Sequence, residues 1–83
     1  MRKQYELNED RKSYKLISFK KGVVDVVIPD KYKGLPVTTI DDTVFFRFHE
    51  MESVYIPASI TNIGNCIFLE SANLKRIVVD KNN

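Results

Sequence analysis

Apolar residues of similar type recur at an interval of 23 positions through the second half of this chain. At this interval Val44 is followed by Ile67, and Phe45 is followed by Phe68. The other matched pairs are Thr38 and Thr61, Ile40 and Ile63, Met51 and Leu74, Val54 and Ile77, and Ile56 and Val79. Repetition at a period of about 20–50 residues is typical of stacked repeats rather than of a closed globule. The pattern therefore predicts a solenoid in which equivalent residues of successive coils share one continuous core.

Two short runs near the beginning of the chain alternate between apolar and polar residues. Tyr5 and Leu7 alternate with polar neighbours, and Tyr14 and Leu16 do the same after a polar segment. Two alternating runs on either side of a turn-rich segment are typical of a β-hairpin. We therefore expect an N-terminal hairpin within residues 1–22.

A run rich in β-branched residues follows at residues 23–28. It ends at Pro29, which has no N–H to donate to a strand ladder. Residues 30–36 contain one glycine and one proline, which commonly interrupt regular structure. This order predicts a strand and then a long loop, which together occupy residues 23–36.

Two units of similar layout make up the remainder, at residues 37–59 and 60–83. The first begins with a short β-prone segment and ends in a return strand before a proline. Between these strands, Val44, Phe45 and Phe48 have a spacing that is consistent with one or two turns of helix facing inward. The second unit repeats this order, so we expect a short helical or 3₁₀ turn on the same side of each coil.

These residues resemble the leucine-rich repeats of the bacterial surface-antigen (BspA-like) class. The resemblance rests on the segments Val37–Ile40, Val44–Phe45, Val54–Pro57, Ile60–Gly64, Ile67–Phe68 and Ile77–Val79. It extends over roughly residues 23–80. The chain departs from the family pattern at Asp41, which stands at a glycine position, and at Val44, which replaces a small alanine.

The resemblance implies a fold and a general role. The fold is a β-rich leucine-rich-repeat solenoid with short helical or 3₁₀ turns on one side and an N-terminal β-hairpin cap. Proteins of this family occur mainly on bacterial surfaces and are associated with adhesion. The resemblance thus implies a non-enzymatic module for binding other proteins, placed at the cell surface or secreted.

Length and composition agree with one domain and leave the compartment open. The chain has 83 residues, of which 43% are hydrophobic and 29% charged, and no apolar run approaches the 18–20 or so residues of a membrane span. The segment after Met1 is polar and has no apolar core of a signal peptide. Either a cytoplasmic protein or a chain whose signal has been removed is consistent with this beginning.

The net charge of +2 is unevenly distributed, because residues 1–36 hold nine Lys and Arg against five Asp and Glu. Nucleic-acid binding is therefore one alternative function. The cations that would carry it are Arg2, Lys3, Arg11, Lys12, Lys15, Lys20 and Lys21. Acidic residues interrupt this set and no arginine cluster forms, so a solvated surface is the favoured interpretation.

The chain offers few residues for catalysis or for binding a metal. His49 is its one histidine and Cys66 its one cysteine, so the ligand spacing of a zinc site is absent. Cys66 is expected to be a buried structural thiol, with a crosslink between two chains as the alternative. We expect no cofactor, no metal and no enzymatic activity.

Strand alternation predicts which residues face outward from the sheet. With Val26, Val54 and Ile77 pointing inward, their neighbours form two outward rows. These rows are Asp25, Ser53 and Arg76, and Val27, Tyr55 and Val78. A tyrosine between two valines is suited to protein recognition, so these six residues are the predicted binding site.

The last unit suggests a second function. Solenoids generally need about three repeats or more and polar caps, and this sequence ends after a strand. We expect either the N-terminal part of a longer array or a chain that covers this end by forming a homodimer. The residues that would form the dimer contact are Phe68, Leu74, Ile77 and Val79.

Overall fold

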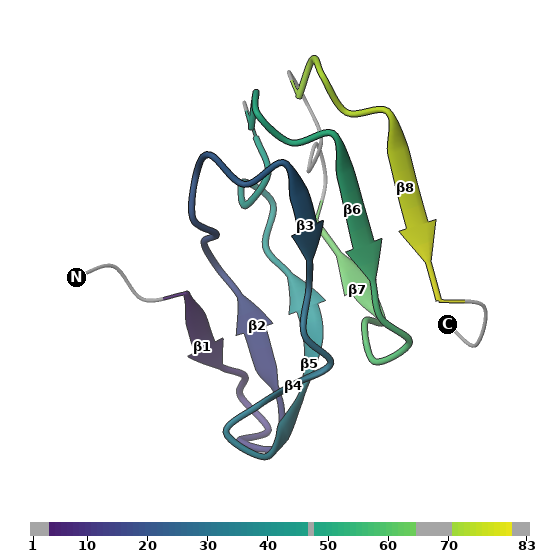
Figure 1. Ribbon diagram of the computed structural model, residues 1–83. Coiled ribbons are helices and arrows are strands. Elements are labelled where there is room, and N and C mark those ends of the chain that lie inside the picture. The colour runs from purple at the N-terminus through teal and green to yellow at the C-terminus, as the bar shows by residue number, and fades with distance from the viewer. Residues whose placement is uncertain (1–3, 47, 65–70, 81–83) are drawn as a thin grey trace.

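The computed structural model describes residues 4–46, 48–64 and 71–80 and consists of two facing β-sheets. Figure 1 shows them as two layers of short strands. The strands are β1 (Tyr5–Leu7), β2 (Tyr14–Leu16), β3 (Asp25–Val27), β4 (Lys31–Tyr32), β5 (Leu35–Ile40), β6 (Ser53–Ile56), β7 (Asn62–Ile63) and β8 (Arg76–Val79). We call the sheet with strand order β1-β2-β5-β7 sheet A, and β4 is joined to it through β5. The other sheet, with strand order β3-β6-β8, is called sheet B.

The chain winds between the two sheets as a solenoid. After β1, each coil contributes one strand to sheet A and then one to sheet B, so β2 and β3, β5 and β6, and β7 and β8 form successive coils (Figure 1). Strands of neighbouring coils are parallel in both sheets. Parallel strands need a crossover connection, and here the opposite sheet of the same coil provides it.

The 23-residue period is confirmed by the strand register. Ile40 pairs with Ile63 between β5 and β7, and Tyr55 pairs with Val78 between β6 and β8. The preceding coil is longer, because Val27 pairs with Tyr55. The extra residues are accommodated where β4 forms.

The core lies between the two sheets. It is made of the inward side chains of both sheets together with the aromatic residues that close one side of the coils. Its buried members are Leu16, Val26, Ile28, Val37, Ile40, Val44, Phe45, Phe48, Met51, Val54, Ile56 and Ile60. Equivalent residues of successive coils thus share one core, as expected for a solenoid.

The predicted helical or 3₁₀ turns are wrong for the described residues, which contain no helix. Between β5 and β6 the chain makes separate turns, in which the N–H of Val44 bonds to the carbonyl of Asp41 and that of Phe48 to the carbonyl of Phe45. Val44, Phe45 and Phe48 do face inward, as their spacing indicated. Helix nucleation is unfavourable in so short a segment, and the equivalent part of the second unit lies outside the described residues.

The segment before β5 also differs from the expected loop. Lys31–Tyr32 (β4) pairs antiparallel with the first residues of β5 through a tight turn at Lys33 and Gly34. The φ angles are 51° at Lys33 and 82° at Gly34. Two consecutive residues with positive φ are typical of the type I′ turn that joins hairpin strands, so a small hairpin occupies part of the predicted loop.

At the other edge of sheet A, β1 and β2 pair antiparallel, with Glu6 opposite Lys15. The second of these strands, β2, also pairs in parallel with β5. The turn between β1 and β2 is tied to the next coil, because the Asn8 side chain donates to the Oγ1 of Thr38 at 3.2 Å. The N-terminal pair of strands is therefore continuous with the solenoid sheet.

Candidate functional site

The outward surface of sheet B, which we call the sheet B face, brings the six predicted binding residues together. Each pairs with its predicted neighbour in the adjacent coil, in the order Asp25, Ser53, Arg76 and the order Val27, Tyr55, Val78. Strand alternation directs these six side chains outward, since the intervening Val26 and Val54 are buried in the core.

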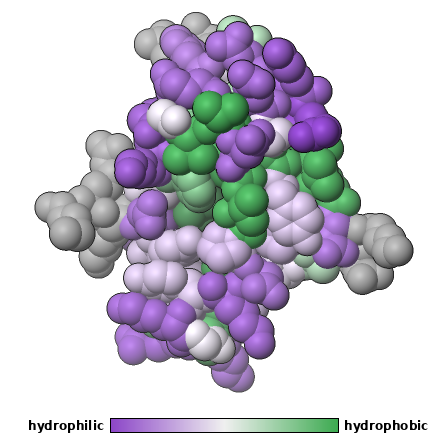
Figure 2. Space-filling view, in the orientation of Figure 1, coloured by the Kyte–Doolittle hydropathy of each residue, from purple (hydrophilic) through white to green (hydrophobic). Residues whose placement is uncertain are grey.

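The middle of the sheet B face is apolar. Val27 is 64% exposed and Val78 is 43% exposed, with the half-buried Tyr55 between them. Figure 2 shows apolar residues in the centre of this view with hydrophilic residues above and below. Exposed apolar residues that adjoin one another in this way are more informative than scattered ones, because such patches often mark interaction surfaces.

Charged residues lie at the end of the sheet B face where its strands begin. The Ser53 hydroxyl donates to Oδ1 of Asp25 at 2.7 Å, and Lys75 Nζ is 4.0 Å from Oε1 of Glu52. Together with Arg76, these residues line a hollow of about 360 Å³. Both signs of charge are present, so this end has no strong preference for an anionic or a cationic partner.

The opposite end of the sheet B face carries a contact that the sequence analysis missed. The hydroxyl of Tyr55 donates to Oδ2 of Asp80 at 2.9 Å. Asp80 stands 23 positions after Pro57, so it replaces a proline that ends the preceding strand. Unlike proline, Asp80 has an N–H, which bonds to the carbonyl of Ile56 at 2.9 Å. This departure from the repeat is the feature of the sequence that could have indicated the contact between Tyr55 and Asp80.

This contact raises the pKa of Tyr55 above its ordinary value. The main cause is the hydrogen bond to Asp80, followed by burial and the negative charges of Asp80 and Asp30. Each of these effects favours the neutral phenol over the phenolate. The Tyr55 hydroxyl therefore keeps its proton, which it donates to Asp80.

We expect Asp80→Asn to lower the pKa of Tyr55 toward its ordinary value, because the amide keeps an acceptor but removes the charge. Phenolate absorbance followed against pH measures this, with Tyr55→Phe subtracted to isolate the one tyrosine. The pKa of Tyr55 is higher in the folded chain than in the unfolded chain. The neutral Tyr55 therefore contributes its full stabilisation of the fold below the unfolded pKa of about 10. This stabilisation is lost as the pH rises through the folded value. Identical titration of both proteins would contradict the assignment.

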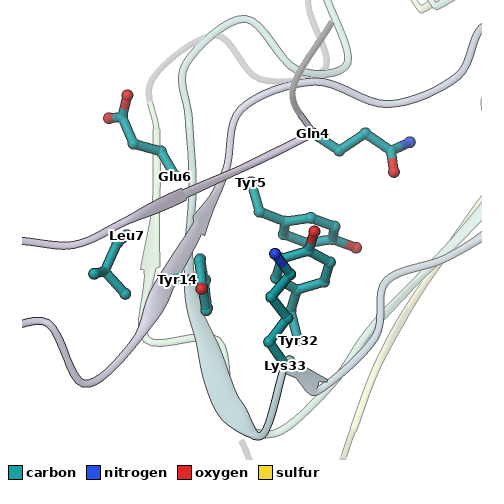
Figure 3. A pocket seen from close by; sticks show the side chains of 7 residues that line it. All are labelled: Gln4, Tyr5, Glu6, Leu7, Tyr14, Tyr32 and Lys33. Atoms are coloured by element: carbon teal, nitrogen blue, oxygen red, sulfur yellow. The ribbon is translucent and has the colours of Figure 1, made fainter. Parts of the chain in front are cut away.

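A second hollow, of about 440 Å³, lies beside β1, β2 and β4 and is rich in tyrosine (Figure 3). The rings of Tyr5 and Tyr32 are stacked with centroids 4.0 Å apart. Tyr14 meets Tyr32 edge to face at 4.9 Å, and Lys33 Nζ is 5.5 Å from the centre of the Tyr32 ring. The three tyrosines are half-buried and pack against the core. Burial and proximity to Tyr32 raise the pKa of Tyr5.

The residues predicted for self-association are divided by the structure. Ile77 is 47% exposed and Val79 is 52% exposed on β8, although both occupy inward positions of the repeat. Leu74 is half-buried against the core, while Phe68 lies outside the described residues, as does Cys66. Within the described residues, β8 is the outer strand of sheet B and pairs with β6 along one edge, which leaves Ile77 and Val79 exposed.

Of the basic residues considered for nucleic-acid binding, Lys21 contacts the segment between β5 and β6. Lys21 donates to the carbonyl of Phe46 at 3.2 Å and lies 4.7 Å from the centre of the Phe48 ring. It therefore packs on the solenoid. Arg2 and Lys3 lie outside the described residues.

Within residues 4–46, 48–64 and 71–80, no group of three or more His, Cys, Asp or Glu is placed to hold a metal ion. The same part of the chain has no helix long and apolar enough to cross a membrane. His49 is exposed, and its carbonyl accepts a hydrogen bond from the Asn73 side chain at 2.7 Å.

Comparison with known proteins supports the repeat fold. The chain is similar to the crystal structure of a leucine-rich repeat protein of T. pallidum, with a TM-score of 0.89 and 28% identity over 95% of this chain. It spans 37% of that chain. No family model and no curated protein matches the sequence. The fold is thus that of a leucine-rich repeat, which suggests a protein-interaction scaffold and is generally non-enzymatic.

Proposed function

We propose that the chain is a protein-binding module that uses the sheet B face. One observation carries this proposal: the row Val27, Tyr55 and Val78 is aligned in register across three coils and exposed between polar ends. Solenoids present extended surfaces of this kind to their partners. The finer role that we propose is adhesion by a bacterial surface protein of the BspA-like class, supported by the repeat pattern of the sequence.

The chemistry of the row supports recognition of a protein segment. Tyrosine combines a large contact area with a polar group and loses little conformational entropy on binding. The hydrogen bond to Asp80 already orders Tyr55, so less entropy remains to be lost when a partner binds. Val27 and Val78 supply apolar area on either side of the ring.

The test uses a phage-displayed library of random peptides selected on the immobilised chain. We expect enriched peptides to bind at least about tenfold more weakly to Tyr55→Ala, because aromatic residues at the centre of an interface commonly contribute more than about 1.4 kcal/mol. Isothermal titration measures the loss. Thermal unfolding followed by circular dichroism checks that the variant remains folded, which its half-buried position favours.

A second variant separates this proposal from self-association. Val78→Lys introduces a charge in the row, so it should abolish peptide binding. It leaves the inward positions Ile77 and Val79 unchanged, so any pairing of two chains through them should persist. Light scattering with reductant present reports the oligomeric state. Unchanged peptide affinity in Tyr55→Ala and in Val78→Lys would refute binding by the sheet B face. If a dimer also survives Val78→Lys, the result would support pairing through Ile77 and Val79.

The nucleic-acid alternative has a test of its own. Retention of the chain on heparin that falls steeply with salt would support it.

We further propose that the N-terminal hairpin caps the solenoid, with residues 1–22 as the cap, 23–36 as the first strand and loop, and 37–59 and 60–83 as the repeats. The support is the tyrosine cluster, in which Tyr5 of the hairpin stacks on Tyr32. These half-buried rings cover the core beside the first coil.

A double-mutant cycle on Tyr5→Ala and Tyr32→Ala tests the cap. We expect a coupling energy of about 0.5–1.5 kcal/mol, the usual contribution of an aromatic pair beyond its buried area. Urea unfolding of the four proteins provides the values. Additive stability losses for Tyr5→Ala and Tyr32→Ala would show that the hairpin is not coupled to the coil. Glu6→Ala on the same strand is the matched control and should change stability little.

A further inference from the structure

We propose that the segment bound by the sheet B face carries a basic side chain, which is held in the hollow between Asp30 and Asp80. This inference rests on the proposed function and names the chemistry of the partner. The hollow is about 370 Å³ and lies where β3 and β6 end, beside the apolar row. It is separate from the mixed-charge hollow at the beginning of the strands.

The described residues that line the hollow give it a negative charge. Asp30 and Asp80 contribute carboxylates, and no lysine or arginine is among the described lining residues. The two charges also act on the Tyr55 hydroxyl, whose pKa both raise. The charge that the described lining residues bring to the Tyr55 end of the apolar row is therefore negative, and a cationic group would complement it.

The walls suit the stem of a long basic side chain. Val27, Pro29 and Pro57 contribute apolar surface to the hollow. Lysine and arginine bury an aliphatic stem along such surface while their charged group remains at the polar end. A carboxylate has about four acceptor sites, so Asp80 can accept a hydrogen bond from a guanidinium or an ammonium group in addition to the bonds that it already makes, including that from Tyr55.

Strand geometry places the hollow close to the apolar row. Val27 and Pro29 are two positions apart in the sequence, a distance of about 6–7 Å in an extended chain. A partner segment with an aliphatic residue on Val27 and Tyr55 would thus place a basic residue one or two positions away over the hollow. The opposite end, with Asp25 and Arg76, holds both signs and would not select for charge.

The experiment repeats the random-peptide selection on the whole chain and on Asp30→Asn and Asp80→Asn. We expect the unaltered chain to enrich peptides in which Arg or Lys lies one or two positions from an aliphatic or aromatic residue. Their affinity should fall about fivefold for each substitution, as for a partly exposed ion pair, and also as salt rises. Glu9→Gln removes one negative charge in the loop after β1 and should leave affinity unchanged.

The outcomes separate this inference from the proposed function. Peptides without a basic residue that depend on Tyr55 and Val78 but not on Asp30 or Asp80 would overturn the inference and leave the proposed function standing. Peptides insensitive to all four positions would overturn both. Asp80→Asn retains an acceptor for Tyr55, and circular dichroism confirms folding, so a loss shared with the isosteric Asp30→Asn reports charge rather than misfolding.

Discussion

Replacing Phe45 by alanine is expected to lower the free energy of unfolding by about 3–5 kcal/mol, the usual range for a buried phenylalanine. Phe45 is fully buried. Its ring centroid lies 5.6 Å from that of Phe48 and 5.8 Å from that of Phe19. The substitution would leave a cavity bounded by these rings, and the short turns around Phe45 give the backbone little freedom to fill it.

The expected consequence is a chain that retains only marginal stability and is partly unfolded near 37 °C. A domain of this size buries only about 60–65% of the surface exposed by its unfolded chain, and small domains are stable by only about 5 kcal/mol or a little more. Urea unfolding followed by circular dichroism measures the change. The adjacent Phe46→Ala is the control, because Phe46 is half-buried. Equal losses for the two variants would show that the core is not centred on Phe45.

The second large effect is expected for Gly64→Ala, which should destabilise the chain by about 3 kcal/mol, at the upper end for overpacking. A Cβ at Gly64 would clash with the Asp42 carboxylate and would lie 2.5 Å from the Asp42 Cα and 2.6 Å from its backbone nitrogen. Backbone atoms cannot move aside as the end of a flexible side chain can. The N–H of Gly64 also bonds to the carbonyl of Ile40 at 2.9 Å, so the clash separates two coils.

Gly22→Ala is the matched control for this prediction. Gly22 has a φ of 92° but open space around it. Its substitution should therefore report the backbone conformation alone, at about 1 kcal/mol or somewhat more. Thermal unfolding of both variants gives the comparison. A smaller loss for Gly64→Ala than for Gly22→Ala would contradict the close approach of the coils.

The arrangement of the sheet B face could be predicted because two simple periodicities determine it. A repeat of 23 residues places Tyr55 beside Val78 when parallel coils stack. Alternation along a strand then sends Val54 inward and leaves Tyr55 outside. Neither step requires knowledge of any side-chain contact, so the pairing order of the six residues was accessible before the structure. Their role in binding stays a proposal.

The connections between strands were less predictable. The spacing of Val44, Phe45 and Phe48 indicated correctly that they face inward, but inward-facing residues can be brought together by separate turns as well as by a helix. Likewise, Gly34 marked a break without showing that Lys33 would adopt a positive φ and join β4 to β5. Local pattern restricts such short segments weakly, because the distance between the two sheets also determines their path.

By itself, the sequence determined the repeat, the pairing of the strands of sheet B and the alternation of their side chains, because these follow from the period of the chain and from strand geometry. Only the tertiary structure decided which side chains meet between coils. The bond from Tyr55 to Asp80 and the stacking of Tyr5 on Tyr32 join residues far apart in the sequence. Such contacts depend on how each turn carries the chain from one sheet to the other. The acidic hollow beside Tyr55 exists for the same reason, since Asp30 and Asp80 come from the ends of different coils.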